Sequence, residues 1–317
     1  MTEPIIVSTW NHGLAANKAA ASIVQVGGDP MTAIVRGIMV TEADPKVTSV
    51  GRGGYPNIDG TMQLDAAVMD GNSLEVGAVA GMEDILYPVA VAQKVMSETR
   101  HTLLVGSGAT QFALSQGFEK TNLLSEGAKK AWEAKKAGQK HAPAGSGADP
   151  ADESDQEESA EPNEFGDPDN HDTIGTVILM PDGRMSAACS TSGAAWKLPG
   201  RVGDSPIAGH GLYCDAEIGG VVATGLGEEF AKICGAFAVI ERMRQGVEPE
   251  QAIREVIQRA VKRDPKNRKT LLAMVALRKD GEIGAASSTP GFQVAIARGT
   301  NHELISIDPM FPRKKKD

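Results

Sequence analysis

The sequence His-Asp-Thr-Ile-Gly at residues 171–175 closes a long polar tract, and the apolar run Val-Ile-Leu-Met follows it at residues 177–180. A short apolar run after a polar tract predicts a buried strand, which would begin close to Thr173. If the peptide bond between Asp172 and Thr173 were cut, Thr173 would become a new amino terminus at the start of that strand. The stretch therefore predicts both a local structure and a reactive group.

A threonine at a new amino terminus can carry its own base. The hydroxyl group alone is a poor nucleophile at neutral pH, and an adjacent free α-amino group is a recognised way to activate it. That amine has an ordinary pKa of about 7.7 to 8.0, so a useful fraction is neutral near pH 7. In the uncut chain the same nitrogen is an amide and cannot accept the proton. Cleavage before Thr173 would thus create the nucleophile and its base in one event.

Four further blocks accompany this stretch: Ser-Thr-Trp-Asn at 8–11, Cys-Ser-Thr-Ser-Gly at 189–193, Gly-Arg-Val-Gly-Asp-Ser-Pro at 200–206 and Ala-Thr-Gly-Leu-Gly at 223–227. Together with residues 171–175 they follow the order and spacing of the glycosylasparaginase branch of the N-terminal nucleophile (Ntn) hydrolases. The chain resembles this family over nearly its whole length. Only the tract before His171 lacks a counterpart there.

The resemblance implies a fold and a maturation step. The family fold is a four-layer αββα sandwich, and the family cleaves its own chain before the catalytic threonine. In this sequence His171 and Asp172 would belong to the cleavage site, and Thr173 would be the nucleophile. Thr191 would hydrogen-bond the nucleophile region and keep its hydroxyl and amine oriented.

The resemblance also implies a substrate site. Arg201 and Asp204 would bind the α-carboxylate and the α-ammonium of an amino-acid substrate, as suits a guanidinium fork and a carboxylate. The alternative for this pair is a surface salt bridge, which stabilises by only about 0 to 1 kcal/mol. Thr224 and Gly225 would contact the substrate and offer a hydroxyl and a backbone N–H to the oxyanion. Trp10 would also contact the substrate.

Apolar periodicity and turn signals predict an α+β fold, because the strands pair locally and the helices come in blocks instead of alternating with strands. The predicted helices cover residues 14–25, 31–43, 83–98, 228–244 and 249–263. The predicted strands cover residues 5–7, 62–69, 73–80, 101–105, 174–180, 184–190 and 219–224, and two more hairpins turn near 280–281 and 300–301.

The chain is predicted to form one domain, 1–317, made of two parts and a linker. Residues 1–118 are the N-terminal part, and residues 173–317 are the C-terminal part that cleavage between Asp172 and Thr173 would separate. Residues 119–170 combine a lysine-rich patch with an acidic run, which predicts a disordered charged linker with a transient helix near 128–137. Residues 149–170 hold ten Asp and Glu and no Lys or Arg, so the rest of the chain is close to neutral despite a formal charge of -9.

Composition argues against several other classes of function. The near-neutral body predicts no nucleic-acid partner, and no apolar run approaches the roughly 18 residues that span a bilayer, so no membrane partner is predicted. Three cysteines without a CxxC pair favour a reducing compartment, the cytoplasm; a periplasmic or other exported location follows if a signal peptide was removed.

No metal and no cofactor are predicted. The chain contains no HExxH motif, no paired metal-ligand cysteines and no GxSxG motif, which disfavours zinc chemistry and a Ser-His-Asp triad. Residues 106–111, Gly-Ser-Gly-Ala-Thr-Gln, lack the third glycine of the dinucleotide fingerprint. Helix capping is the better interpretation of that segment.

The main functional prediction is an autoprocessed amidohydrolase. Its substrate would be the family's, N4-(β-N-acetylglucosaminyl)-L-asparagine, and aspartate would be released through an ester on Thr173. An alternative is the related plant-type L-asparaginase or isoaspartyl peptidase, which shares the fold and much of the clamp; His171, Asp172 and Trp10 favour the first branch. A non-enzyme alternative is an uncleaved amino-acid-binding protein. The family further implies a dimer of cleaved heterodimers.

Overall fold

The computed structural model describes residues 3–139 and 173–312. Within those residues the chain forms eight α-helices and two β-sheets, which confirms the predicted α+β class. His171, Asp172 and residues 140–170 of the predicted linker lie outside the described residues.

The larger sheet has eight strands in the order β12-β11-β1-β5-β6-β2-β3-β4. Every neighbouring pair is antiparallel except β3 and β4, which are parallel. Its strands are β1 (Ile5–Thr9), β2 (Leu64–Asp70), β3 (Val76–Met82), β4 (Leu103–Val105), β5 (Ile174–Leu179), β6 (Met185–Thr191), β11 (Gln293–Arg298) and β12 (Asn301–Ser306). The hairpin β5–β6 and the hairpin β11–β12 confirm two of the local pairings predicted from turn signals.

The smaller sheet has four antiparallel strands in the order β10-β9-β8-β7. They are β7 (Leu212–Asp215), β8 (Gly219–Gly225), β9 (Leu272–Arg278) and β10 (Ile283–Ser287). The hairpin β9–β10 turns at the predicted place, whereas β7 was not predicted. This strand has four residues, which is too few for alternation to be distinguished from a loop.

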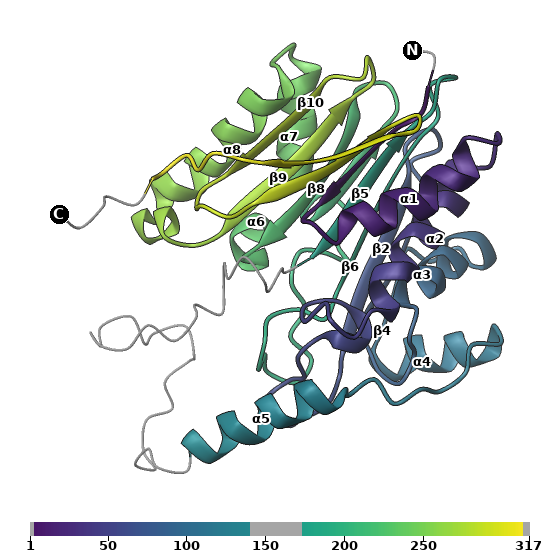
Figure 1. Ribbon diagram of the computed structural model, residues 1–317, viewed down its shortest axis with the longest axis vertical. Helices are drawn as coiled ribbons and strands as arrows, with labels where there is room; N and C mark the ends of the chain where they lie inside the picture. The colour runs from purple at the N-terminus through teal and green to yellow at the C-terminus, as the bar shows by residue number, and fades with distance from the viewer. Residues whose placement is uncertain (1–2, 140–172, 313–317) are drawn as a thin grey trace.

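Helices cover the outer face of each sheet (Figure 1). The helices are α1 (Gly13–Val24), α2 (Pro30–Ala43), α3 (Pro88–Glu98), α4 (Gly106–Ser115), α5 (Glu126–Gln139), α6 (Gly227–Ile233), α7 (Gly235–Arg244) and α8 (Pro249–Arg263), with short 3-10 turns at Gly51–Gly53 and Pro265–Arg268. Helices α1 to α3 pack on the larger sheet, and α7 and α8 pack on the smaller one. The two sheets contact each other through β5, β6 and β8.

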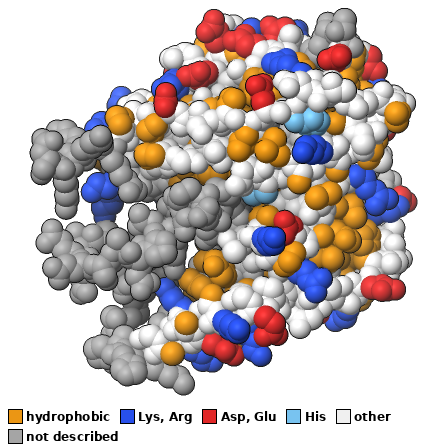
Figure 2. Space-filling model, viewed as in Figure 1, with side chains coloured by type: hydrophobic (Ala, Val, Ile, Leu, Met, Phe, Trp, Pro, Cys, Tyr) orange, Lys and Arg blue, Asp and Glu red, His pale blue; other side chains and the backbone are white. Residues whose placement is uncertain are grey.

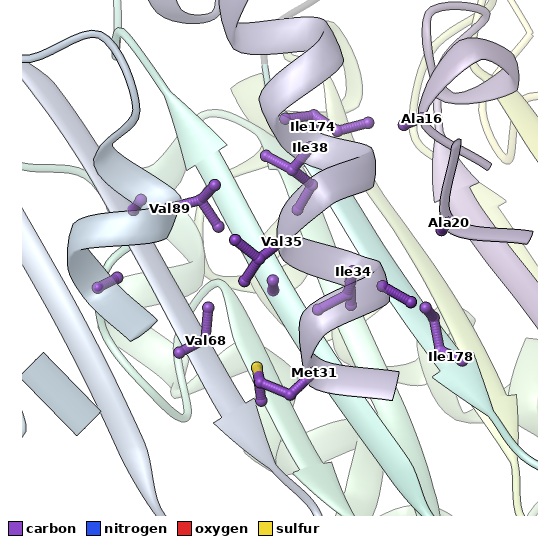
Figure 3. Packing of buried hydrophobic residues seen from close by; sticks show 14 of the residues in the cluster. Ala16, Ala20, Met31, Ile34, Val35, Ile38, Val68, Val89, Ile174 and Ile178 are labelled. Atoms are coloured by element: carbon purple, nitrogen blue, oxygen red, sulfur yellow. The ribbon is translucent and has the colours of Figure 1, made fainter. Parts of the chain in front are cut away.

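Side chains on the two faces of the larger sheet belong to two different hydrophobic cores. Ile174 and Ile178 of β5 point to the helical side, where they pack with Ile34 and Ile38 of α2 (Figure 3). Val177, in the same strand, faces the smaller sheet instead. Because successive side chains of a strand point to opposite faces, a strand buried on both sides reads as a continuous apolar run. That is the run from which β5 was predicted.

Antiparallel pairing brings the ends of three strands of the larger sheet together. Strand β5 starts directly after Thr173, between β1 and β6. Since both neighbours run the other way, their carboxyl ends, Thr9 and Thr191, lie beside the start of β5. The end of β8, at Thr224, reaches the same place from the smaller sheet, because the Thr173 nitrogen donates to its hydroxyl at 3.2 Å. Residues far apart in sequence therefore meet at one edge of the two sheets.

The predicted helix 228–244 is wrong as a single helix. It is divided into α6 and α7 at Cys234, whose φ of 51° is left-handed. A left-handed residue cannot continue a right-handed helix, and Gly235 follows it directly. The predicted helix 83–98 also begins later, at Pro88, since proline fits the first turn of a helix and has no N–H to donate further along.

The segment 119–139 was predicted to belong to a disordered linker 119–170. The structure places α5 in it, and this helix is longer than the transient helix expected near 128–137. Trp132 attaches this helix to the domain, because its indole nitrogen donates to the carbonyl of Ile58 at 3.0 Å. The ring packs against Gly60, where a Cβ atom would lie 2.8 Å from it. Trp132, together with the buried Ala128, therefore packs a helix of largely polar composition against the domain.

On the face seen in Figure 2, acidic and basic side chains are interspersed. Among the described residues no helix is both long enough and apolar enough to cross a membrane.

A carboxyl group is buried between α2 and the larger sheet. Glu42 is fully buried, and its Oε1 accepts hydrogen bonds from Ser190 Oγ at 2.6 Å and from Val89 N at 3.0 Å. Its Oε2 has no hydrogen-bond partner among the described residues. Burial raises the pKa of Glu42 from 4.5 to about 8, against the lowering effect of those two bonds. The side chain is therefore protonated at neutral pH.

We expect Glu42→Gln to stabilise the protein in a pH-dependent way. The unfolded chain loses the Glu42 proton near pH 4.5 and the folded chain near pH 8, so this group lowers the free energy of unfolding as pH rises between those values. Glutamine stays neutral, and the gain at pH 8 should reach on the order of 4 kcal/mol, with little gain at pH 5. Urea unfolding at both pH values measures it. The exposed Glu133→Gln on α5 is the control; parallel behaviour of the two variants would contradict the assignment.

Candidate active site

Thr173 is held through its own backbone on both sides. The residue is buried, with 5% of its surface exposed. Thr9 Oγ1 donates to the carbonyl of Thr173 at 2.6 Å and accepts from the N–H of Gly175 at 2.9 Å. One hydroxyl at the end of β1 therefore fixes the first residues of β5. This contact joins residues 164 positions apart, so no local signal in the sequence predicted Thr9.

The two reactive groups of Thr173 each have a polar neighbour. Its hydroxyl lies 3.3 Å from the hydroxyl of Ser205, and its nitrogen donates to Thr224 Oγ1 at 3.2 Å. Ser205 was quoted in the block 200–206 but received no role. Its position next to Asp204 in a glycine-containing turn was the only signal that could have suggested one.

Thr224 is oriented as a donor by its neighbours. Its oxygen accepts from Trp10 Nε1 at 3.0 Å and from Thr173 N at 3.2 Å. A hydroxyl has two acceptor positions and one proton, so both acceptor positions are taken and the proton remains to be donated. Such a fixed donor beside a nucleophile is suited to stabilising a developing oxyanion.

Gly225 continues this corner with a conformation that other residues avoid. Its φ is 104°, and a Cβ atom added there would lie 2.1 Å from the carbonyl oxygen of Leu271. Only glycine fits, and its N–H lies next to Thr224 in the chain. Strand β8 therefore ends in a sharp turn at the pocket.

A pocket opens over Thr173. It is lined by Thr173, Thr191, Gly193, Ala194, Arg201, Gly203, Asp204, Ser205, Gly225, Leu226 and Gly227. The structure thus brings together the predicted nucleophile, Thr191, the predicted charge pair and Gly225 from four separate sequence blocks. Among the described residues no group of three or more His, Cys, Asp or Glu could hold a metal ion.

Asp204 is the negative group of this pocket. It is 4% exposed, and its Oδ2 has no hydrogen-bond partner among the residues described. Burial raises the pKa of Asp204 to about 6, and the Arg201 charge opposes that rise. At neutral pH the carboxylate is ionised and has an unused acceptor, which a ligand cation could satisfy.

Next to the pocket lies a buried ion pair between Lys197 and Asp65. Lys197 Nζ is 3.5 Å from Asp65 Oδ2 and donates to the carbonyl of Gln63 at 2.9 Å. A Cβ atom at Gly193 would lie 2.8 Å from that Nζ, so the lysine supports the floor of the pocket. Sequence reasoning gave Lys197 no role, because nothing near it in the sequence identifies Asp65 as its partner.

Trp10 lies behind the pocket and is not among the lining residues. It is 2% exposed, has a φ of 65°, and packs edge-on against Phe292 with 5.0 Å between ring centroids. The indole N–H bond to Thr224 is its described link to the site. Its predicted contact with substrate stays a prediction, and the geometry gives it a supporting place.

Thr191 lines the pocket, and its described contacts lie on the side of the neighbouring loop. Its hydroxyl donates to the carbonyl of Ser49 at 3.4 Å and accepts from Gly193 N at 2.9 Å. The predicted bond to the nucleophile region stays a prediction. His171 and Asp172, the other two residues of the predicted cleavage site, lie outside the described residues.

Comparison with known proteins shows the family of the chain. A protein-family model described as asparaginase matches residues 8–307. The chain belongs to the asparaginase family. The chain is therefore a hydrolase acting on amide C–N bonds. The match covers nearly the whole chain, as does the resemblance noted in the sequence.

Relatives within the asparaginase family include proteins named as glycosylasparaginases and one named as an isoaspartyl peptidase/L-asparaginase. An N(4)-(β-N-acetylglucosaminyl)-L-asparaginase of Elizabethkingia miricola is 43% identical, over 93% of this chain and 81% of its own. The rat protein of the same name is 36% identical, over 89% of this chain and 84% of its own. A probable isoaspartyl peptidase/L-asparaginase of Arabidopsis thaliana is 35% identical, over 92% of this chain and 87% of its own.

Proposed function

We propose that this chain is an autoprocessed glycosylasparaginase, which hydrolyses the side-chain amide of N4-(β-N-acetylglucosaminyl)-L-asparagine to aspartate and the glycosylamine. The observation that carries the proposal is the shared pocket. Thr173 directly precedes the buried strand β5 and lines the pocket. Arg201 and Asp204 line the same pocket. The names of the bacterial and rat relatives support the choice of substrate.

Maturation precedes catalysis in this proposal. The Thr173 hydroxyl attacks the carbonyl carbon of Asp172, the C–N bond breaks, the nitrogen takes up a proton, and an ester links the two residues. Water then hydrolyses the ester and leaves a free carboxylate on Asp172 and a free amine on Thr173. The products are a chain of residues 1–172 and a chain of residues 173–317, which stay in one domain because β5 lies between β1 and β6.

In turnover the new amine accepts the proton of the Thr173 hydroxyl as the oxygen attacks the side-chain carbonyl of the substrate. The Thr224 hydroxyl and the Gly225 N–H stabilise the oxyanion. The proton passes to the leaving nitrogen, the glycosylamine departs, and a β-aspartyl ester remains on Thr173. Water activated by the same amine hydrolyses this ester and releases aspartate.

Arg201 and Asp204 recognise the amino-acid end of the substrate. The guanidinium binds the α-carboxylate, and the buried Asp204 carboxylate binds the α-ammonium, which satisfies the oxygen that lacks a partner. Helices on the outer faces of two contacting sheets support the four-layer αββα sandwich of the Ntn hydrolases as the fold. The assembly proposed from the family is a dimer of cleaved heterodimers.

The plant-type L-asparaginase or isoaspartyl peptidase is the second candidate. The Arabidopsis relative carries that name, and an aspartyl clamp of the same kind would serve its substrates. The higher identity to a named glycosylasparaginase favours the first candidate. The substrate panel below separates the two.

The first experiment is the intact mass of the purified protein, followed by a substrate panel. We expect two chains, residues 1–172 and residues 173–317. We also expect a kcat/KM for glycosylasparagine well above that for asparagine or β-aspartyl dipeptides. A preference for β-aspartyl dipeptides would replace the proposal by the second candidate. An uncut chain that binds aspartate and hydrolyses no amide would support the binding-protein alternative.

Acid should weaken substrate recognition through Asp204. Burial raises the pKa of Asp204 to about 6, so below that pH the group becomes neutral and no longer attracts an ammonium ion. The inhibition constant of L-aspartate should rise about tenfold for each pH unit below 6 and stay level above it. The Asp204→Asn variant should bind L-aspartate weakly, and the plot of its inhibition constant against pH should show no inflection near pH 6. An unchanged inflection in that variant would assign it to another group.

A further inference from the structure

Arg201, the proposed carboxylate-binding residue, already holds a carboxylate of the protein. Its Nε donates to Glu228 Oε1 and its Nη2 donates to Glu228 Oε2, both at 2.7 Å. This is a two-pronged ion pair in which the arginine side chain is 19% exposed and the glutamate side chain 45% exposed. Paired bonds of this geometry fix a guanidinium in orientation as well as in position.

The pair uses one edge of the guanidinium and leaves another. Nε and Nη2 face Glu228, whereas Nη1 faces two glycines. A Cβ atom at Gly193 would lie 3.2 Å from Nη1, and one at Gly203 would lie 3.1 Å from it. Both glycines line the pocket. The missing side chains keep open the space on the Nη1 side, where a second carboxylate can approach.

Glu228 directly follows the turn at residues 225–227, which contains the proposed oxyanion donor Gly225. Gly225, Leu226 and Gly227 line the pocket, and Glu228 follows in the first turn of α6. A Cβ atom at Gly227 would lie 2.5 Å from Asp204 Oδ1, so this turn packs directly on the other half of the clamp. The position of Glu228 is thus fixed by a turn that lines the pocket and packs against Asp204.

The charges of the pair stabilise each other. Burial disfavours charge on Arg201, but the bonds to Glu228 raise the pKa of the guanidinium above its ordinary value. Burial likewise opposes ionisation of Glu228, and the bonds from Arg201 hold its pKa below the ordinary value. Both partners are therefore charged across the neutral range.

We propose that Glu228 is a positioning residue for substrate recognition: it grips the Nε–Nη2 edge of Arg201 so that the Nη1 side is presented to the α-carboxylate of the substrate. The inference rests on the proposed function, since it assigns a role within the same clamp. Its rival is a Glu228 that occupies the place of the substrate carboxylate and must be displaced. The two roles predict opposite changes in substrate affinity when Glu228 is replaced. Loss of a positioning residue weakens binding, whereas loss of a competitor strengthens it.

The test is Glu228→Gln, measured on cleaved protein. A glutamine cannot accept from both guanidinium nitrogens, so Arg201 loses its fixed orientation. We expect the KM for glycosylasparagine and the inhibition constant of L-aspartate to rise in parallel by about tenfold, with kcat changed less than twofold. Glu228→Asp, which keeps the charge on a shorter side chain, should restore part of the affinity. A merely structural role would lower the melting temperature and would not separate KM from kcat in this way.

The matched control is Glu255→Gln. It removes the charge from another arginine pair, in which Arg242 Nε donates to Glu255 Oε2 at 2.6 Å on the α7–α8 surface, away from the residues lining the pocket. This variant should keep the KM and kcat of the unaltered protein. In an Arg201→Ala background, Glu228→Gln should cause no further loss, because the residue that it positions is gone.

A KM that falls, or stays unchanged, in Glu228→Gln would overturn the inference, and so would an equal loss in the Arg201→Ala background. These outcomes are distinct from failure of the proposed function. That failure would appear in the unaltered protein itself, as absence of glycosylasparagine hydrolysis after cleavage. Calorimetric binding of L-aspartate to the same variants tests the role of Glu228 without any catalytic step.

Discussion

Thr173→Ala should remain a single chain of 317 residues and release no aspartate from any substrate. Alanine has no oxygen to attack the carbonyl of Asp172, so the peptide bond before residue 173 survives. Without that oxygen there is also no nucleophile for turnover. Both losses should be complete within the detection limit of an intact-mass measurement and of an aspartate assay.

The fold should tolerate this change. The backbone of residue 173 is held by Thr9, through a carbonyl and an N–H that alanine retains. The melting temperature of Thr173→Ala should therefore stay close to that of the uncut form of the unaltered chain. Thr173→Ser, which keeps a hydroxyl, is the matched control and should still cleave.

Blocking the new amine tests the second half of the same mechanism. Acetylation of the mature Thr173 nitrogen leaves the hydroxyl in place and removes the base, so hydrolysis should be abolished. Cleavage in Thr173→Ala, full activity in an uncut chain, or full activity after acetylation would each refute the proposal that Thr173 is nucleophile and base.

Thr224→Val should lower kcat by about 100- to 1000-fold, the usual effect of losing one oxyanion donor. Valine has nearly the shape of threonine but no hydroxyl. The change also leaves Trp10 Nε1 and the Thr173 nitrogen without the oxygen that accepts from both. Because that oxygen contacts the group proposed as the base, we expect the effect mainly in kcat and less in KM.

The measurement is steady-state hydrolysis by the cleaved fraction, whose amount is first determined by mass. Thr41→Val is the matched control, since its buried hydroxyl on α2 has no hydrogen-bond partner among the described residues. It should leave kcat unchanged, and Thr224→Ser should recover most of the lost rate. A Thr224→Val enzyme with normal kcat would exclude the Thr224 hydroxyl as the oxyanion donor.

The sequence by itself determined the parts that depend on neighbours along the chain. The run after Thr173 and the turn that follows it predicted the hairpin β5–β6, and alternation with turn signals predicted β9–β10 and β11–β12. Helix α8 was predicted with its observed bounds, because its apolar face repeats at helical spacing and Pro249 fits its first turn. The blocks around Thr173, Arg201 and Thr224 pointed to one site through their resemblance to the Ntn hydrolases.

Only the tertiary structure decided which side chains of those blocks meet, and on which side of the pocket. It placed Trp10 behind Thr224, brought Thr9 to the backbone of Thr173, and joined Glu228 to Arg201. It also packed α5 against the domain through Trp132 and Ala128. Local propensity depends on residues within a few positions, whereas these contacts depend on strand register and on packing between segments up to 214 residues apart. The direction of a hydroxyl proton or the free edge of a guanidinium is set by such distant partners, and no pattern along the chain contains that information.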